Sequence, residues 1–457
     1  MIKRSAIAGL AMMLTLIAGP GVRAETLADT LAAAYTNSGL LDQNRALLRA
    51  ADENVAQSVA ATLPVINWAM ATNRTYNAAA PTSALQDTTS TTARISGSLT
   101  LYDGGANRLA IDSQKEIVLS TRQSLRGIEQ DVLLRAVQAY MNVRREREFV
   151  ELRQNNQRLI TQELQAARDR FDVGEVTRTD VSLAQARLAG SQSLLAAAQG
   201  NLAQSIAEYT AAVGRVPSGS GAAAPAPVLQ SVQDAKAFAL RNHPAVLQVQ
   251  HSVAAAELAV QRGEAALRPN LSLNSFVAVD DEWNESAQIG LSLGGPIYNG
   301  GAIASQIRQL QANRDASRAG LHLALIGVEQ RVANAYAALQ VARASAQASD
   351  QQVSAARIAF EGVREEASLG SRTTLDVLNA EQELLDAQAN RIAADVDEVI
   401  ASYSVLAAMG LLTAEHLQLP VQQYDVSAYY NLVNNSPVAA SPQGEALDRV
   451  LEALSRD

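Results

Sequence analysis

The residue types that carry most enzyme chemistry are sparse in this sequence, and their spacing fits no reaction centre. The chain has no cysteine, and so no thiolate nucleophile, no thiolate metal ligand and no disulfide. Its four histidines show no HExxH spacing. Only His243 and His251 fall close together, on a polar helical stretch where solvated side chains are expected. We therefore expect no enzyme activity, no metal and no cofactor.

Two other motifs are superficially like catalytic or binding elements. The pairs Gly104 with Gly105 and Gly300 with Gly301 would suit a phosphate-binding loop, but no Gly-Lys-Ser/Thr follows, so they predict strand-to-helix turns. The many serines include no G-x-S-x-G nucleophile elbow. Nucleic acid is not an expected partner, because 46 acidic residues outnumber 37 basic ones and no strong basic block is present.

The first 24 residues differ from the rest of the chain. Lys3 and Arg4 precede an apolar run from Ala6 to Ala18, and small residues end the segment at Ala24. This pattern predicts a cleavable export signal over 1–24. No other stretch offers the ~18 uncharged apolar residues that a transmembrane helix needs. Two alternatives remain: a soluble exported protein, or one that meets the membrane through strands.

The rest of the chain is an internal duplication. A shift of 196 residues places Tyr102 on Tyr298 and Asp180 on Asp376, without a gap over roughly 100 residues. Upstream the shift becomes 205, so the first half has about nine extra residues, which we expect in a loop around 78–91. The expected organisation is a first repeat over 25–216, a Gly/Ser/Pro/Ala-rich linker over 217–230, a second repeat over 231–412 and an unmatched appendage over 413–457.

Each repeat contains two stretches with the period-2 alternation of a half-buried strand. The apolar members of the two clearest strands, expected to face lipid, are Ile95, Leu99, Leu101, Ile289, Leu291 and Leu293. The polar members, expected on the opposite face, are Arg94, Ser96, Ser98, Gln288 and Ser292. Strands of about ten residues suit a tilted membrane span, although a small β-patch on a soluble helical protein is the alternative. Four strands cannot close a barrel alone, since small barrels need about eight.

Very long helices are expected after Gly105 and Gly301, where about 65 residues follow without proline. Such a helix is about 100 Å long, which no ordinary globule accommodates. Between Leu375 and Leu406, apolar residues recur at alternating spacings of three and four, the pattern of a coiled-coil seam. Gly174 and Gly370 are placed to reverse each long helix into a hairpin.

These features together resemble the TolC-type outer-membrane channel proteins of bacterial efflux and type I secretion. The resemblance covers nearly the whole chain after the export signal. It rests on the duplication, the strand ends "LTLYDGGAN" and "GGPIYNGGA", the turns "FDVGEVTRTDV" and "SLGSRTTLDVLNAEQELL", and the tail "QYDVSAYYNLV". It implies a mainly α fold with a small β part, in which three chains share a twelve-stranded barrel and long coiled-coil helices form a periplasmic tunnel. Residues 413–457 would lie around the tunnel equator and be partly disordered.

The resemblance also implies a function and partners. The chain would be an outer-membrane exit duct for efflux of small molecules, type I protein secretion or both. It would be a homotrimer in contact with outer-membrane lipid, and would work with a periplasmic adaptor and an inner-membrane ABC or RND transporter. The adaptor would meet the hairpin turns at Gly174 and Gly370. The alternative is an exported structural or adhesive coiled-coil protein without channel activity; a helical pore-forming toxin is disfavoured because no long apolar helical hairpin is present.

In this family the tunnel is closed at its periplasmic tip by polar links near the helical turns. By resemblance, Arg372 in "GSRTTLD" stands where the family has a linking arginine. Thr179 and Asp180 in "TRTDV" stand where it has the acceptors. These three residues are therefore the expected latch.

The resemblance also places the constriction. Asp376 matches the first acidic residue of the family's ring, while Asn379 stands where many members have a second aspartate, and Ala367 where an aromatic linker is common. From the residues alone, Asp180 and Asp376 have a second interpretation, as acidic residues that stabilise helix N-termini. Both roles can hold together.

Overall fold

The structure, a computed structural model, describes residues 25–77, 86–219, 221–438 and 441–454. The expected export signal lies outside these ranges. So do residues 78–85, part of the loop expected to hold the extra residues of the first repeat. The remainder of that expectation is wrong, because residues 86–91 belong to a strand.

The duplication is confirmed as two matched sets of elements. The helices of the first repeat are α1 (Leu27–Asn37), α2 (Gly39–Ala60), α3 (Ala106–Asp172) and α4 (Arg178–Val213). Those of the second repeat are α5 (Val232–Asn242), α6 (Pro244–Ala265), α7 (Ala302–Ser368) and α8 (Thr374–Met409). Corresponding helices have identical lengths of 11, 22, 67 and 36 residues. Two short helices follow, α9 (Ala428–Val433) and α10 (Pro442–Leu454).

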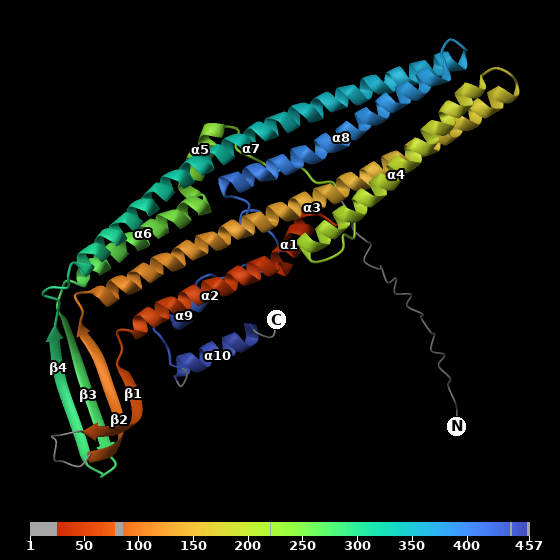
Figure 1. Ribbon diagram of the computed structural model, residues 1–457. Helices are drawn as coiled ribbons and strands as arrows, with labels where there is room; N and C mark the ends of the chain where they lie inside the picture. The colour runs from red at the N-terminus through yellow and green to blue at the C-terminus, as the bar shows by residue number, and fades with distance from the viewer. Residues whose placement is uncertain (1–24, 78–85, 220, 439–440, 455–457) are drawn as a thin grey trace, which may run out of the picture.

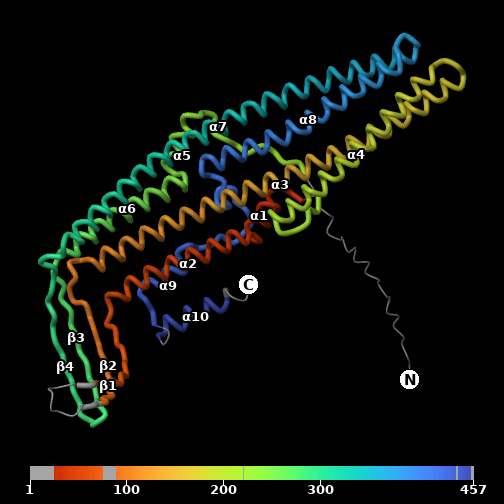
Figure 2. Tube along the Cα trace, viewed as in Figure 1, coloured from red at the N-terminus to blue at the C-terminus, as the bar shows by residue number. Residues whose placement is uncertain are grey.

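The molecule is an elongated shaft with a sheet at one end (Figure 1). The long helices α3 and α7 run from the sheet to the opposite end, where each turns back into α4 or α8 (Figure 2). The shorter helices occupy the half of the shaft nearer the sheet: α1 and α2 pack on α3, and α5 and α6 pack on α7. Both hairpin tips therefore lie at the end farthest from the strands.

Local sequence signals explain where the elements stop. Pro64 and Pro269 directly precede strands β1 and β3, just after the ends of α2 and α6, as expected of residues that cannot continue a helix. Gly104 and Gly105 have φ of +70° and +89°, and the Asp103 carboxylate accepts from the backbone N–H groups of Gly105 and Asn107 at 2.9 and 2.6 Å. The strand thus turns sharply into α3.

The segment between the repeats is held against the long helices by two equivalent tyrosines. The Tyr140 hydroxyl oxygen of α3 lies 2.9 Å from the backbone carbonyl oxygens of both Glu25 and Gly221, which share its one donor hydrogen. Tyr336, its counterpart on α7, donates to the carbonyl of Leu229 at 2.9 Å. The two repeats use the same position to anchor the chain that joins them.

The four strands form one antiparallel sheet in the order β1-β2-β3-β4. Their bounds are β1 (Val65–Asn77), β2 (Gln86–Tyr102), β3 (Asn270–Asp280) and β4 (Glu285–Gly294). Ile95 lies opposite Trp68 on one side and Val277 on the other, so apolar residues share one face. The helices of the described ranges include none that is long and apolar enough to cross a membrane.

Leu101 departs from the alternation expected of it. The register shifts between Thr100 and Tyr102, so Tyr102, rather than Leu101, lies opposite Leu271. Such a bulge inserts one residue and bends the strand just before it turns into α3. The pairing with β3 is thus regular through Thr100, and Leu101 is the inserted residue.

Candidate gate at the hairpin tips

The two hairpin turns are built alike. Gly174 and Gly370 have φ of +80° and +79°, a left-handed conformation that favours glycine. The next residue in each turn, Glu175 or Ser371, donates its backbone N–H to a carbonyl of the preceding helix, at 2.9 and 3.0 Å. These bonds satisfy carbonyls that the helix end would otherwise leave unpaired. Since no atom lies within 4 Å of a Cβ built at either glycine, backbone conformation rather than crowding requires it.

The first turns of α4 and α8 each carry a capping box. The Asp180 carboxylate accepts from the N–H and hydroxyl of Thr177 at 2.9 and 2.7 Å. Asp376 makes the same bonds to Thr373 at 3.0 and 2.8 Å. These bonds lower the pKa of both carboxyls, so both are ionised at neutral pH. Asp180 and Asp376 therefore do cap these helices. Each carboxylate still carries its negative charge at the tip of its hairpin.

Within one chain, the expected latch residues are not paired with one another. Arg372 Nε donates to a carboxylate oxygen of Glu366 at 2.8 Å, within its own hairpin, and both side chains are about half exposed. Thr179 is exposed on α4, while the Asp180 carboxylate is engaged by Thr177. Within one chain, the side chains of Arg372 and Asp180 thus bond to residues of their own hairpins.

Asn379 connects the two hairpins. Its side-chain oxygen accepts from Arg187 of α4 at 3.1 Å, across two segments 192 residues apart in sequence. An asparagine here supplies the acceptor oxygen without adding a charge to the tip. Ala367, near the end of α7, presents no aromatic ring.

His243 is a structural residue that sequence reasoning missed. The expectation that it is solvated is wrong: only 5% of it is exposed. Its Nδ1 accepts from the Ala245 N–H at 3.1 Å at the start of α6, and the ring also bonds the carbonyl of Ala407 near the end of α8. Burial, and next the charge of Arg331, lower its pKa to about 4. A neutral imidazole, with one acceptor and one donor nitrogen, can cap both helix ends at once.

His251 is not simply solvated either. It lies on α6, and its Nδ1 is 2.8 Å from a carboxylate oxygen of Glu116 on α3. The described residues contain no group of three or more His, Asp or Glu side chains arranged to hold a metal ion. The two histidines thus join helices to one another.

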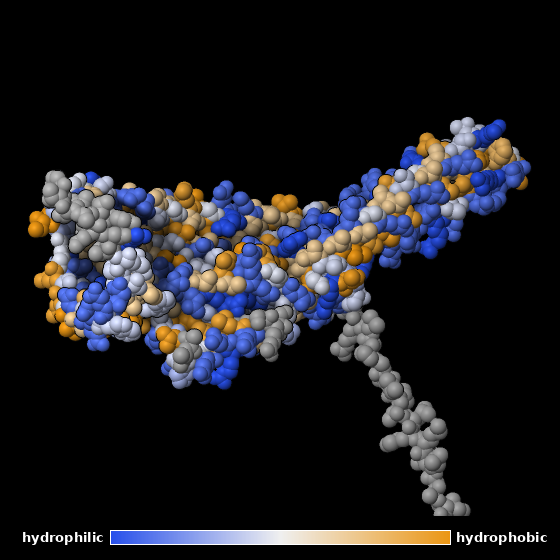
Figure 3. Space-filling model, turned by 60° about the horizontal axis from the view of Figure 1, so that its bottom comes forward, coloured by the Kyte–Doolittle hydropathy of each residue, from blue (hydrophilic) through white to orange (hydrophobic). Residues whose placement is uncertain are grey.

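One face of the sheet carries large apolar side chains that are exposed. Trp68 is 81% exposed and Ile289 is 76% exposed. Figure 3 shows orange, apolar side chains gathered at the left-hand end of the molecule, where the strands lie. Other large apolar residues exposed on this face are Ile66, Met70, Ile95, Val277, Leu291 and Leu293. Water would disfavour so large an apolar patch on a monomer.

The opposite face of the sheet is polar. Ser96, Ser98 and Gln288 lie on it, and Arg94 stacks over the ring of Phe276 with its guanidinium carbon 3.6 Å from the ring centroid. The structure therefore segregates apolar and polar residues between two faces, as the alternation predicted.

Comparison with known proteins identifies the family. The profile of the family described as "Outer membrane efflux protein" matches residues 30–215 and 238–411. The outer membrane efflux protein BepC of Brucella suis biovar 1 (strain 1330) is 35% identical over 429 residues, which cover 92% of this chain and 93% of BepC. The outer membrane protein TolC of Vibrio cholerae serotype O1 is 24% identical over 417 residues, covering 86% and 92% of the two chains.

Solved structures share the fold at low sequence identity. The Campylobacter jejuni CmeC outer membrane channel superposes with a TM-score of 0.76 at 16% identity, covering 90% of each chain. The outer membrane protein VceC of Vibrio cholerae gives a TM-score of 0.72 at 19% identity, covering 84% of this chain and 96% of VceC. The family consists of outer membrane channel proteins rather than enzymes. With its duplicated helical hairpins and four-stranded sheet, the chain belongs to the outer membrane efflux protein family, the TolC-type channels.

Proposed function

We propose that three copies of this chain form an exit duct through the outer membrane. Each copy contributes its four strands to a shared twelve-stranded barrel, and its long helices to a tunnel that crosses the periplasm. The observation that carries this proposal is the sheet at the end of the shaft, with an exposed apolar face and one edge each at β1 and β4. In lipid, each unpaired backbone group at an open edge costs several kcal/mol, so the sheet has to be closed by other chains.

The partners follow from the opposite end of the shaft. The tips around Gly174 and Gly370 lie farthest from the strands, and in the proposed duct they would project into the periplasm. There they would contact a periplasmic adaptor, which would connect the duct to an inner-membrane ABC or RND transporter. The cargo would be small molecules, secreted protein or both, because the relatives include the alkaline protease secretion protein AprF and the pyoverdine export protein OpmQ.

At the tip, three copies of Asp376 would form an acidic ring around the constriction. The latch would then run between chains, from Arg372 of one to Thr179 and Asp180 of the next. Such a link competes with the bond that Arg372 makes to Glu366 in its own hairpin. Because Arg372 would have two alternative partners, a docking protein could shift it from one partner to the other with modest contacts of its own.

Disulfide trapping tests the shared barrel. Because the chain has no cysteine of its own, any disulfide must join the introduced residues. Asn67→Cys on β1 is combined in turn with Ser286→Cys, Gln288→Cys or Ser292→Cys on β4, all on the polar face. Within one chain, β1 and β4 are three strand spacings apart, about 14 Å, too far for a disulfide. A covalent trimer on a non-reducing gel from at least one pair is the expected result.

Matched controls are the corresponding single-cysteine variants, which can give dimers at most. If every pair leaves only monomers while the protein is in the outer membrane, the sheet is not shared and the proposal fails. Ion conductance of the purified protein in a planar bilayer separates the duct from an exported coiled-coil protein that forms no channel.

A further inference from the structure

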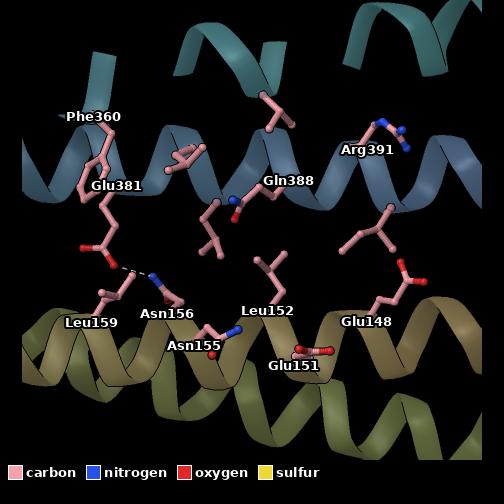
Figure 4. Close-up of a pocket in the computed structure, with 14 residues that line it drawn as sticks. Glu148, Glu151, Leu152, Asn155, Asn156, Leu159, Phe360, Glu381, Gln388 and Arg391 are labelled. Atoms are coloured by element: carbon pink, nitrogen blue, oxygen red, sulfur yellow. Dashed lines mark hydrogen bonds between the residues drawn. The ribbon is translucent and has the colours of Figure 1, made fainter. Parts of the chain in front are cut away.

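A cavity lies along the shaft where the two hairpins meet, just toward the sheet from the tips. It has a volume of about 480 Å³, is lined by α3, α7 and α8, and is open to one side (Figure 4). That volume is within the range of about 300–1,000 Å³ in which drug-sized molecules bind. Its apolar lining comprises Leu152, Leu159, Val353, Phe360, Leu384, Leu385 and Ile392.

The charged lining of this cavity is mainly acidic. Glu148, Glu151 and Glu381 are its carboxylates, and Arg391 is its one cationic side chain. Arg391 is already paired with Asp350 of α7 and Asp395 of α8, so its charge is compensated outside the cavity. The Glu148 carboxylate also has a partner, Arg144 at 2.9 Å. Glu151 and Glu381 are left as the cavity's main sources of negative charge.

Glu381 is the most buried of these carboxylates, with 4% of the residue exposed. It extends from α8 across the cavity and accepts a hydrogen bond from the Asn156 side-chain nitrogen of α3 at 2.9 Å (Figure 4). Burial, and next the neighbouring charge of Glu163, raise its pKa to about 7, against the opposing charges of Arg364 and Arg187. A carboxyl in an apolar cavity with one neutral hydrogen-bond donor is poorly compensated when ionised.

We propose that this cavity binds an amphipathic organic cation, with the apolar part against Phe360 and the leucines and the charged group against the Glu381 carboxylate. A cation adds positive charge beside Glu381, where Arg364 and Arg187 only partly offset the effect of burial. The aromatic ring of Phe360 adds an apolar and cation-attracting surface. The site is made by one chain, so it does not depend on the duct proposed above.

The arrangement couples binding to a proton. Without ligand, the raised pKa of Glu381 leaves part of the population protonated at neutral pH. A permanent cation favours the ionised form, so its binding releases that proton, and its affinity increases as pH rises toward 8. A site held together by apolar contacts alone would show no such dependence.

The probe is ethidium, a permanent aromatic cation, titrated into the purified full-length protein in detergent and followed by fluorescence anisotropy. We expect Glu381→Gln, which keeps the size of the side chain and removes the charge, to weaken ethidium binding at least tenfold at pH 8. It should also abolish the pH dependence between pH 6 and 8. Phe360→Ala should weaken binding but keep the pH dependence.

Glu383→Gln is the matched control, because it removes the same charge from the same helix at an exposed position outside the cavity. Its affinity should equal that of the unmodified protein, and neutral phenanthridine should bind weakly to all variants. Equal ethidium affinity in the unmodified protein and Glu381→Gln, or a flat pH profile, would overturn the proposal. This test measures binding, whereas the duct is tested by conductance. A negative result for ethidium binding would therefore not contradict the proposed duct, and a negative result for the duct would not contradict this binding site.

Discussion

Asp376 combines two properties that can be separated by substitution. Its carboxylate completes the capping box with Thr373 at the start of α8, and it also places a negative charge at the tip. The first property stabilises one helix end, whereas the second would act on ions passing through a ring of three copies. An asparagine keeps a side-chain acceptor for the capping bonds and removes the charge.

We predict that Asp376→Asn reduces the cation selectivity of the channel without loss of the folded protein. Thr373→Ala, the matched partner, should leave selectivity unchanged and destabilise the start of α8 by about 0.5–2 kcal/mol, because it removes the N-cap hydroxyl. The measurements are the reversal potential under a salt gradient and the denaturant midpoint. An unaltered reversal potential in Asp376→Asn would remove the acidic ring from the mechanism.

At the scale of elements, His243 explains how two helices can meet end to end. Helix α8 ends at Gly410, which lies directly against His243 and Pro244. A Cβ on Gly410 would be 2.9 Å from the Pro244 ring. A neutral imidazole accepts from the start of α6 and bonds the end of α8. Protonation turns the acceptor nitrogen into a donor, so it breaks the cap on α6.

The folded-state pKa of His243, about 4, lies below its ordinary value of 6.5, so acid favours the unfolded chain. Stability from this residue is complete above about pH 6.5 and is lost as pH falls toward 4. The loss is about 3 kcal/mol per chain. We predict that His243→Asn, which can cap α6 but does not titrate, is less stable than the unmodified protein at pH 7.5, and that this difference shrinks by pH 4.5. The stability difference is measured as the difference in thermal midpoint between the two proteins, at one scan rate and at each pH. A difference that does not change with pH would contradict the prediction.

The two faces of the sheet give an element-scale prediction of their own. Leu99 lies opposite Leu273 on the apolar face, and Ser98 lies opposite Asn274 on the polar face. An arginine facing lipid near mid-membrane costs about 2–4 kcal/mol, and much less in a water-filled lumen. We therefore expect Leu99→Arg to reduce the amount of assembled protein in outer-membrane fractions far more than Ser98→Arg does. Equal losses would mean that the facing is assigned wrongly.

The elements themselves could be predicted from sequence because their signals are local. Alternation identifies β2, Pro64 and Pro269 mark helix ends, and Gly174 and Gly370 stand at the hairpin turns. The features that the sequence did not predict come from contacts between distant segments. The bulge at Leu101 depends on register with β3, and the burial of His243 depends on the end of α8 arriving beside it. Sequence periodicity does not predict contacts between segments that are distant in the sequence.

The residues expected at the gate lie at or near the hairpin turns, but their bonds could not be predicted from the sequence. The resemblance placed Arg372, Asp376 and Asn379 at the tip, where the structure has them. It did not reveal that Arg372 pairs with Glu366, or that Asn379 pairs with Arg187. The first pairing requires the shape of the turn, and the second requires the two repeats to pack side by side.

For the molecule as a whole, the latch proposed above would be a contact that only assembly completes. We predict that Arg372→Ser and Asp180→Ala each raise single-channel conductance of the trimer without preventing assembly. The double variant should show a less than additive effect, because both substitutions break the same link. Glu366→Gln should act in the opposite direction, since it frees Arg372 from its partner within the hairpin.

Planar-bilayer recordings measure all four variants. Additive effects would show that Arg372 and Asp180 act on separate parts of the tip. Conductance equal to that of the unmodified trimer in every variant would exclude the latch.

The identical lengths of α3 and α7, and of α4 and α8, limit how this chain can change during evolution. One added residue lengthens a helix by about 1.5 Å and rotates everything beyond it by about 100°. An insertion in one shaft helix would therefore turn its seam away from its neighbour and leave one tip higher than the other. Tolerated changes in shaft length should be inherited as matched sets, in both arms of a hairpin and in both repeats. Single insertions and deletions should gather in the connection between β1 and β2 and in the chain beyond α8.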